Sequence, residues 1–388
     1  MLWPYRRRVG KRKLPVNASE SPRRHENSHR QEVIANVATS VALRVLPRIP
    51  SRIKRLLLGR RSVILDGYAL DSTLQLVLAA QNAVGNDGLV SSDDVVAERS
   101  RLETLTASFS QHIPVAGVTN LSIPGPAGLI PARHYRPDPD VAGGPSAILV
   151  FYHGGGFTLG SLESHDDQCR LICRDGGIHV LSIDYRLAPE HKFPAPVLDA
   201  FAAYRWAVDN APELGIDPKR VAVGGDSAGG TLAAVVSQLA RDEDVQLPAL
   251  QLLLYPATDY VNTTYSRTVF ADGFLLTERD LDWFRRNYLD GADVELSDPR
   301  VSPLLADDLS GLPPALVVTG GFDPLRDEGT KYAEAMRAAG VIVDHRQFTS
   351  LVHGFVTFFP LGGDSAAATT KIISALRAHT CHAGGNAW

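Results

Sequence analysis

Cysteine is scarce in this chain of 388 residues, which contains only Cys169, Cys173 and Cys381. Cys169 and Cys173 stand four positions apart in a segment with a helical pattern, and an odd count without regular spacing argues against a disulfide framework. No cluster of cysteine and histidine has the spacing of zinc ligands, so we predict no metal site. Few cysteines without a framework favour a reducing compartment, and we expect a cytoplasmic protein.

Long hydrophobic runs are also missing. The most apolar early segment, residues 33–46, is 14 residues long and is interrupted by four polar residues. A helix that spans a bilayer needs about 20 apolar residues, so this segment is too short and too polar. Residues 1–30 have neither the apolar core nor the small-residue cleavage site of a signal peptide. We therefore expect neither a transmembrane helix nor a signal peptide.

Charge of one sign does not dominate the whole chain, whose formal net charge is −4, and this balance predicts no nucleic-acid partner. The distribution is uneven, however. Residues 1–61 hold 16 Lys and Arg against three Glu, a charge of +13, whereas the remainder holds 23 basic and 40 acidic residues, a charge of −17. The sequence therefore predicts a basic N-terminal extension over residues 1–60 and a separate acidic body.

Three interpretations of the basic extension remain open. Residues 1–30 lack periodicity and have few aromatics, which predicts disorder, so the extension could be a solvated tail. Residues 33–58 have irregular apolar spacing with interleaved Arg and Lys, which suggests two short amphipathic helices. Such helices either pack on the body as an extra layer or make weak peripheral contact with an anionic membrane surface.

The body, residues 61–388, alternates strand and helix patterns. An opening β-hairpin is predicted around the turn-prone segment at 124–128, and short continuous apolar runs follow, as expected for strands covered on both faces. Helical stretches lie between them near 165–175, 197–210, 228–242, 327–339 and 366–378. This alternation predicts a mostly parallel twisted sheet with helices on both faces. Residues 260–303 break the pattern and indicate an insertion over the sheet edge.

The strongest chemical signal is Gly225-Asp226-Ser227-Ala228-Gly229, which follows a predicted strand and precedes a long helix. In that context G-x-S-x-G is typical of a nucleophile elbow, a tight turn that holds the serine hydroxyl clear of the sheet. A dinucleotide-binding loop is excluded, because neither Gly224 nor Gly225 has a glycine two positions later. Ser227 is therefore the predicted nucleophile.

A second glycine-rich loop, His153-Gly154-Gly155-Gly156-Phe157, ends an earlier strand. Bare backbone N–H groups in such a loop stabilise the oxyanion of a tetrahedral intermediate, and a loop of this kind is expected two core strands before the elbow. His153 precedes the nucleophile, whereas the base of this fold follows it. We therefore assign His153, with Gly154, a role in supporting the loop.

The catalytic base and acid are sought after Ser227, in the order Ser, Asp or Glu, His. His353 lies in a loop after the last predicted strand, whereas His345 falls within that strand, and His379 and His382 lie near the C-terminus. Asp323 ends the preceding strand and could also cap the following helix. The neighbouring Asp327 and Glu328 fall in the first turn of that helix. We predict a Ser227–His353–Asp323 triad.

These motifs together resemble the hormone-sensitive-lipase-like family of carboxylesterases, bacterial family IV, over residues 65–380. The Asp before the nucleophile places the chain in the GDSAG branch. Further blocks of the family occur in the same order and spacing: HGGGF, DYRLAPEHKFPAP (184–196), YPATD (255–259), DPRVSPL (298–304), LPPALVVTGGFDPLRDEG (312–329) and LVHGF.

The resemblance implies an α/β-hydrolase fold and a serine carboxylesterase that acts on esters of short to medium acyl chains. It implies an oxyanion hole made by the N–H groups of Gly155, Gly156 and Ala228. It also implies a small helical cap from about 65–110 and 260–300, and no cofactor or metal. An amidase or deacetylase with the same triad is the alternative within enzymes. A non-catalytic small-molecule receptor of the same fold is the alternative outside them, although such receptors lose the catalytic histidine.

Overall fold

The computed structural model describes residues 45–59, 62–83, 85, 88–142 and 146–382. The chain divides into two compact units, Met1–Ala42 and Leu43–Trp388, and all described residues belong to the second unit. The predicted disordered segment 1–30 and most of the first amphipathic segment after it lie outside the described residues.

An eight-stranded sheet forms the centre of the second unit, in the order β10-β9-β8-β7-β5-β6-β4-β3. Five of the seven strand pairs are parallel, and the antiparallel pairs are β3 with β4 and β4 with β6. The predicted hairpin and the mostly parallel sheet are thus confirmed. The strands are β3 (Gly117–Gly125), β4 (Gly128–Arg136), β5 (Ser146–Tyr152), β6 (His179–Ile183), β7 (Ile216–Asp226), β8 (Gln251–Leu254), β9 (Ala315–Phe322) and β10 (Val343–Val352).

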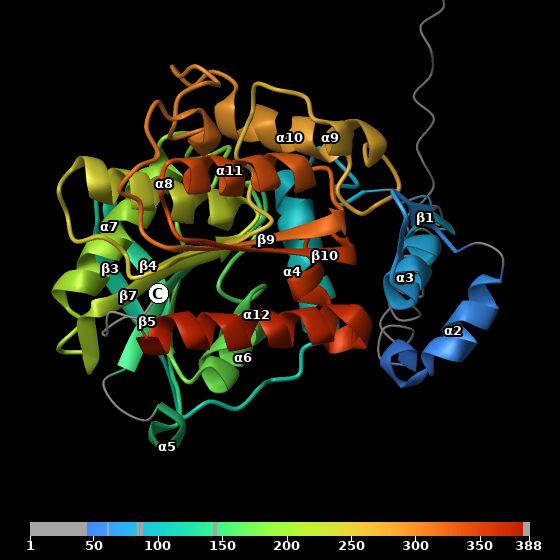
Figure 1. Cartoon of the computed structure of the whole chain (residues 1–388), viewed down its shortest axis with the longest axis horizontal. Coiled ribbons are helices and arrows are strands. Elements are labelled where there is room, and N and C mark those ends of the chain that lie inside the picture. The colour runs from blue at the N-terminus through green and yellow to red at the C-terminus, as the bar shows by residue number, and fades with distance from the viewer. Residues whose placement is uncertain (1–44, 60–61, 84, 86–87, 143–145, 383–388) are drawn as a thin grey trace, which may run out of the picture. The chain divides into compact units, whose positions relative to one another are not determined.

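Helices cover both faces of this sheet (Figure 1). On one face, side chains of β5 such as Ile148 and Val150 pack in one core with helices α7, α8 and α11. On the other face, Leu149 and Phe151 pack in a second core with α6 and α12. The alternating side chains of a strand point to opposite faces, which explains why the β5 sequence is apolar throughout. The helices are α6 (Asp166–Gly176), α7 (Ala195–Asp209), α8 (Ala228–Asp242), α11 (Arg326–Ala338) and α12 (Gly363–His382).

The residues before the sheet form short elements. The segment predicted to hold amphipathic helices contains a 3₁₀ turn, η1 (Leu46–Arg48), and α2 (Ser51–Leu58). The latter helix is joined to α3 (Ser72–Ala83) by a 2.9 Å hydrogen bond from Lys54 Nζ to Thr73 Oγ1. Between α2 and α3 lies a small antiparallel pair, β1 (Ile64–Leu65) and β2 (Tyr68–Ala69).

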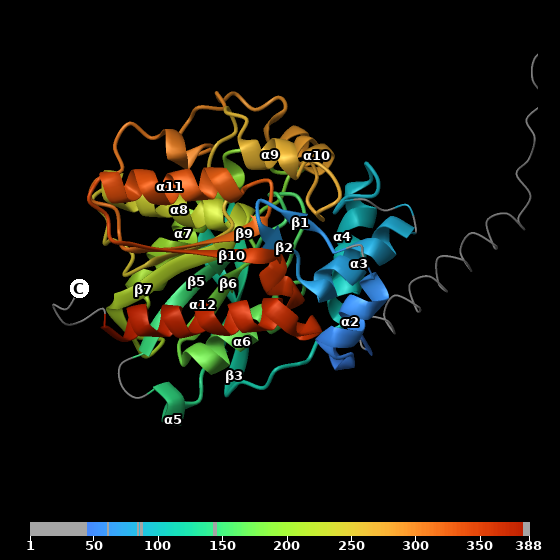
Figure 2. The ribbon, with the colours of Figure 1, turned by 45° about the vertical axis from the view of Figure 1, so that its right-hand side comes forward.

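Three further helices come from the N-terminal region and from the predicted insertion: α4 (Val95–Ser108), α9 (Tyr265–Val269) and α10 (Glu278–Leu289). In both Figure 1 and Figure 2, α9 and α10 lie on the same side of the sheet as α8 and α11. The Asp280 carboxylate in the first turn of α10 accepts hydrogen bonds from the N–H groups of Leu89 and Val90. This carboxylate therefore joins the segment before α4 to α10.

The remaining elements are short: α5 (Pro139–Ala142), η2 (Pro303–Leu305) and η3 (Phe355–Leu361). Within the described ranges, every helix falls short of a bilayer span in length or in hydropathy.

Candidate active site

Ser227 stands between the end of β7 and the first residue of α8, with φ of 54° and ψ of −119°. Its N–H donates to the Leu254 carbonyl at 2.8 Å, which ties the turn to the neighbouring strand β8. A Cβ added at Gly225 or Gly229 would collide with the Tyr152 carbonyl of β5. Glycine at both positions lets the tight turn approach the adjacent strand, as a nucleophile elbow requires.

The structure brings together the three residues of the predicted triad, although they lie up to 126 positions apart in the sequence. His353 Nε2 is 2.9 Å from Ser227 Oγ, and His353 Nδ1 is 2.9 Å from Asp323 Oδ2. Both distances allow hydrogen bonds, and a carboxylate can only accept. Nδ1 therefore carries a proton, which leaves Nε2 free to accept the serine proton.

The base and acid are both held in place by their surroundings. Asp323 is fully buried after β9, and its other oxygen accepts from the Leu325 N–H at 2.8 Å, so it also caps the turn before α11. His353 follows β10 and packs edge-on against Tyr255, with ring centroids 4.9 Å apart. The rotamers of both side chains are thus restricted by packing and by hydrogen bonds.

The rejected candidates lie elsewhere. His345 is on β10, and its Nε2 is 3.1 Å from Thr319 Oγ1 rather than near the nucleophile. Asp327 accepts from the Ser266 N–H and pairs with Arg326. His379 is part of α12, where its Nε2 lies 3.3 Å from Asp344. The helix extends further toward the C-terminus than the sequence indicated.

The glycine loop begins directly after β5. Gly155 has φ of 111° and Gly156 has φ of 59°, conformations that side chains rarely adopt. The Gly155 carbonyl accepts from the N–H groups of Thr158 and Leu159, which turns the loop back on itself. A Cβ on Gly156 would collide with the ring of Phe284 from α10. Ala228, the third predicted donor, is the first residue of α8, where N–H groups have no intrahelical acceptor.

His153 is fully buried behind this loop and does not contact Ser227 Oγ. Its ring stacks on Tyr185 at 4.4 Å, and its Nδ1 lies 2.8 Å from the Gly154 carbonyl. The Tyr185 hydroxyl donates to the His153 carbonyl at 2.7 Å. Burial, and the neighbouring His165, lower the pKa of His153 to about 3, so its ring is neutral and donates through Nδ1. These contacts fit loop support rather than base catalysis.

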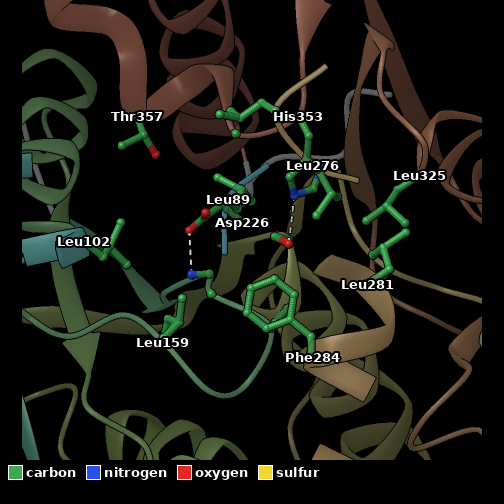
Figure 3. Close-up of a pocket in the computed structure, with 18 of the residues that line it drawn as sticks. Leu89, Leu102, Leu159, Asp226, Leu276, Leu281, Phe284, Leu325, His353 and Thr357 are labelled. Atoms are coloured by element: carbon green, nitrogen blue, oxygen red, sulfur yellow. Dashed lines mark hydrogen bonds between the residues drawn. The ribbon is translucent and has the colours of Figure 1, made fainter. Parts of the chain in front are cut away.

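Two residues beside the nucleophile were missed in the sequence. The Asp226 carboxylate accepts from the Gly154 N–H at 2.9 Å (dashed in Figure 3), and His165 Nε2 lies 3.3 Å from the same oxygen. The only signal for Asp226 was its place inside the elbow motif, and His165 belongs to no motif block. Their proximity depends on the pairing of β5 with β7, which the sequence does not display.

A cavity of about 150 Å³ opens next to Ser227. Figure 3 shows apolar side chains directed into it from several segments, among them Leu102 of α4 and Leu281 and Phe284 of α10. Further labelled apolar residues on the wall are Leu89, Leu159, Leu276 and Leu325. Such walls favour an uncharged hydrocarbon group next to the nucleophile.

The sheet order, the elbow after β7 and the Ser–His–Asp chain together define an α/β-hydrolase with a serine nucleophile. A family model described as alpha/beta hydrolase fold matches residues 149–357. The fold class predicted from the sequence is therefore confirmed.

Named relatives narrow this class. The chain is 56% identical to a carboxylic ester hydrolase (LipN) of Mycobacterium tuberculosis, over 89% of this chain and 93% of the relative. It is 40% identical to an esterase (LipI) of the same organism, over 74% of this chain and 88% of the relative. Among solved structures, an ester hydrolase from the Lake Arreo metagenome matches with a TM-score of 0.75 and 41% identity, over 82% of this chain and 99% of that one.

The chain belongs to the hormone-sensitive-lipase-like carboxylesterases, and the predicted resemblance is confirmed. It is an enzyme of the carboxylic ester hydrolase class. A non-catalytic receptor, the alternative from another class, is not favoured by these relatives.

Proposed function

We propose that the enzyme hydrolyses carboxylic esters through an acyl-enzyme on Ser227, with His353 as the base and Asp323 as the residue that orients it. The observation that carries this proposal is the continuous pair of 2.9 Å hydrogen-bond distances from Ser227 through His353 to Asp323. Ser227 attacks the ester carbonyl carbon while His353 takes its proton, and the imidazolium then protonates the leaving alcohol. A water molecule, deprotonated by His353, next attacks the acyl-enzyme and releases the acid.

The oxyanion formed in both steps would lie against the N–H groups of Gly155, Gly156 and Ala228. The positive φ of the two glycines and the position of Ala228 at the start of α8 support this role. Donors fixed before the reaction stabilise developing charge without reorganising, and the helix dipole adds a partial positive charge at the same place.

The helical segments at about 65–110 and 260–300 would act as a cap over this site. Support comes from α4 and α10, each of which supplies side chains to the cavity walls. Apolar walls around the acyl group keep bulk water away from the developing charge, which strengthens the electrostatic interactions there.

Short to medium acyl chains are the proposed substrates. A cavity of about 150 Å³ has the volume of an engineered cavity that holds one benzene molecule. Leu102 and Leu281 both lie on the wall of this space. A long hydrocarbon chain would have to extend beyond these walls into solvent.

A series of p-nitrophenyl esters from acetyl to palmitoyl tests this preference. We expect kcat/KM to be highest among short and medium chains and to fall steeply for palmitoyl. Substitution Leu281→Ala should move the optimum toward longer chains, because it removes part of the cavity wall, while Leu281→Phe should move it toward acetyl. A maximum at palmitoyl with activation at a lipid interface would contradict the proposal, and a matched ester and anilide of one acid would measure any amidase activity.

Weak peripheral contact with an anionic membrane is a second candidate property, for the basic N-terminal segment. The described part supports it because Ile53, Leu56 and Leu57 of α2 are exposed beside Arg52 and Arg55. Each basic residue near an anionic bilayer contributes about 1 kcal/mol, and salt weakens that attraction.

Sedimentation with phosphatidylglycerol vesicles, compared with phosphatidylcholine vesicles, tests this contact. Deletion of residues 1–44, which leaves α2 on α3, and the double substitution Leu56→Ser and Leu57→Ser should each reduce binding. Hydrolysis of soluble esters should not change. Equal binding by all variants, or none by the full chain, would contradict membrane contact.

A further inference from the structure

A second buried carboxylate lies next to the nucleophile and has no part in the triad. Asp226 is 4% exposed, and one of its oxygens faces both the Gly154 N–H, at 2.9 Å, and His165 Nε2, at 3.3 Å. Figure 3 shows its side chain at the wall of the substrate cavity, bonded to the glycine loop. Burial of a charge is unfavourable unless hydrogen bonds or an ion pair compensate it. We therefore ask what these two partners of Asp226 contribute to the site.

Strand register fixes where this carboxylate points. The parallel pairing of β5 with β7 sets Tyr152 against Gly225, so the next residue of β7, Asp226, reaches the start of the glycine loop. A Cβ on Gly154 would collide with the Asp226 carboxylate. Gly154 therefore makes room for Asp226, and the two residues form one fitted contact between the loop and the elbow.

His165 holds the carboxylate from the other side. A carboxylate only accepts, so His165 Nε2 donates to it. The opposite ring nitrogen, Nδ1, is 2.8 Å from Ser164 Oγ, and that hydroxyl accepts from the Ser161 N–H at 2.8 Å. The His165 ring also lies 5.5 Å from the ring of His153. Each ring nitrogen of His165 thus has a polar partner, and these contacts hold the ring in the orientation that donates to Asp226.

The carboxylate is ionised in this setting. Burial alone would raise the pKa of Asp226, but His165 and the Gly154 N–H outweigh it and hold the pKa below its usual value. A hydrogen bond to a charged acceptor is about twice as strong as one between neutral groups. The bond from Gly154 is therefore one of the strong restraints on the loop.

We propose that Asp226, held by His165, is a positioning residue that fixes residues 154–156 with the N–H groups of Gly155 and Gly156 directed at the oxyanion. The inference rests on the proposed function, since it assumes the same oxyanion hole. Asp226 acts through the loop rather than on the reacting atoms. Its contribution is therefore largest when the oxyanion forms and small when the neutral ester binds.

The test is Asp226→Asn, an isosteric change that removes the charge. Loss of one oxyanion donor costs roughly 10²–10³ in kcat, so a displaced loop should lower kcat by about 10- to 100-fold with little change in KM. Butylboronic acid, which forms a tetrahedral adduct on the serine, should bind more weakly by a similar factor. His165→Phe should reproduce part of both effects, and His165→Gln, which retains an N–H donor, should restore part of what His165→Phe loses.

Asp199→Asn is the matched control, because Asp199 is 1% exposed and accepts from Arg186. It should lower the melting temperature without changing butylboronate affinity relative to substrate affinity. Asp226→Asn and His165→Phe with kcat and butylboronate affinity like the unsubstituted enzyme would overturn the inference, as would equal losses in Asp199→Asn. Activity that survives Ser227→Ala would instead overturn the proposed function, so the two failures are distinguishable.

Discussion

At the scale of single residues, the assignment of the base depends on which histidine reaches the nucleophile. His353 and His345 both belong to the C-terminal part of the sheet, but only His353 Nε2 lies within 2.9 Å of Ser227 Oγ. His345 contacts Thr319 instead. Substituting each histidine in turn therefore tests the assignment of the base.

We predict that Ser227→Ala and His353→Ala each lower kcat on the order of 10⁴–10⁶-fold, the usual loss for such residues. His345→Ala should leave kcat close to that of the unsubstituted enzyme, because its ring has no contact with the reacting atoms. Steady-state kinetics with a short-chain ester, together with circular dichroism to verify folding, measure these effects. An inactive His345→Ala with an active His353→Ala would reverse the assignment.

Residue-level prediction from the sequence was possible where a residue belongs to a motif with a known order along the chain. Ser227, Asp323 and His353 were found in this way, and the structure brings them together. Asp226 and His165 were not assigned a role because their contact is set by strand register and by the loop before α6. Neither of these is encoded in local spacing.

At the scale of elements, α10 lies against the glycine loop of the proposed oxyanion hole through the ring of Phe284. A Cβ on Gly156 would collide with a side chain, Phe284, whereas a Cβ on Gly229 would collide with the backbone of β5. Side chains can be removed, but a strand backbone cannot move without disturbing the sheet. The two glycines should therefore differ in whether a second substitution restores activity.

We predict that Gly156→Ala lowers kcat by roughly 10²-fold, comparable to the loss of one oxyanion donor. Adding Phe284→Ala should recover part of that loss, a positive coupling that a double-mutant cycle measures. Gly229→Ala should be inactive or unstable with or without Phe284→Ala. If Phe284→Ala gives no recovery at Gly156, the positive φ of this glycine, and not the Phe284 ring, accounts for the loss.

Elements with regular periodicity were predicted best. The β3–β4 hairpin and helices α6, α7, α8, α11 and α12 follow from local pattern. Helix α4 was not identified as a helix, because its apolar residues do not gather on one face of it. Its start is defined by Asp94, whose side chain accepts from the N–H groups of Val96 and Ala97. Its fixed place also depends on Asp280, almost two hundred residues away in the chain.

At the scale of the whole molecule, one buried and one half-buried histidine link stability to pH. His134 on β4 and His179 on β6 stack at 5.0 Å, with His134 Nε2 2.8 Å from His179 Nδ1. Burial, with Arg136 nearby, lowers the pKa of each to about 4. The unfolded chain therefore takes up protons at a higher pH than the folded chain does. Stability is fully present above about pH 6.5 and is lost as the pH falls toward 4.

The free energy of unfolding falls between those pH values. We predict that this pair accounts for on the order of 2 kcal/mol of the fall, a figure that already allows for the partial exposure of His179. Urea unfolding at a series of pH values should show a shallower slope for the double substitution His134→Gln and His179→Gln. The exposed His191→Gln is the control and should keep the slope. Glu328, whose pKa burial raises to about 8, changes stability in the opposite direction, so only the comparison of variants isolates the pair. An identical slope in all three proteins would refute the prediction.

The catalytic triad and part of the cavity wall come from different kinds of element, and this separation has a consequence for evolution. Ser227, Asp323 and His353 lie at or just beyond the ends of β7, β9 and β10, whereas Leu102 and Phe284 belong to the helices α4 and α10. Mutations can accumulate on those two helices without altering the register that holds the triad. Substitutions on the cavity side of these helices can therefore change which ester is accepted while Ser227, His353 and Asp323 keep their places at the strand ends.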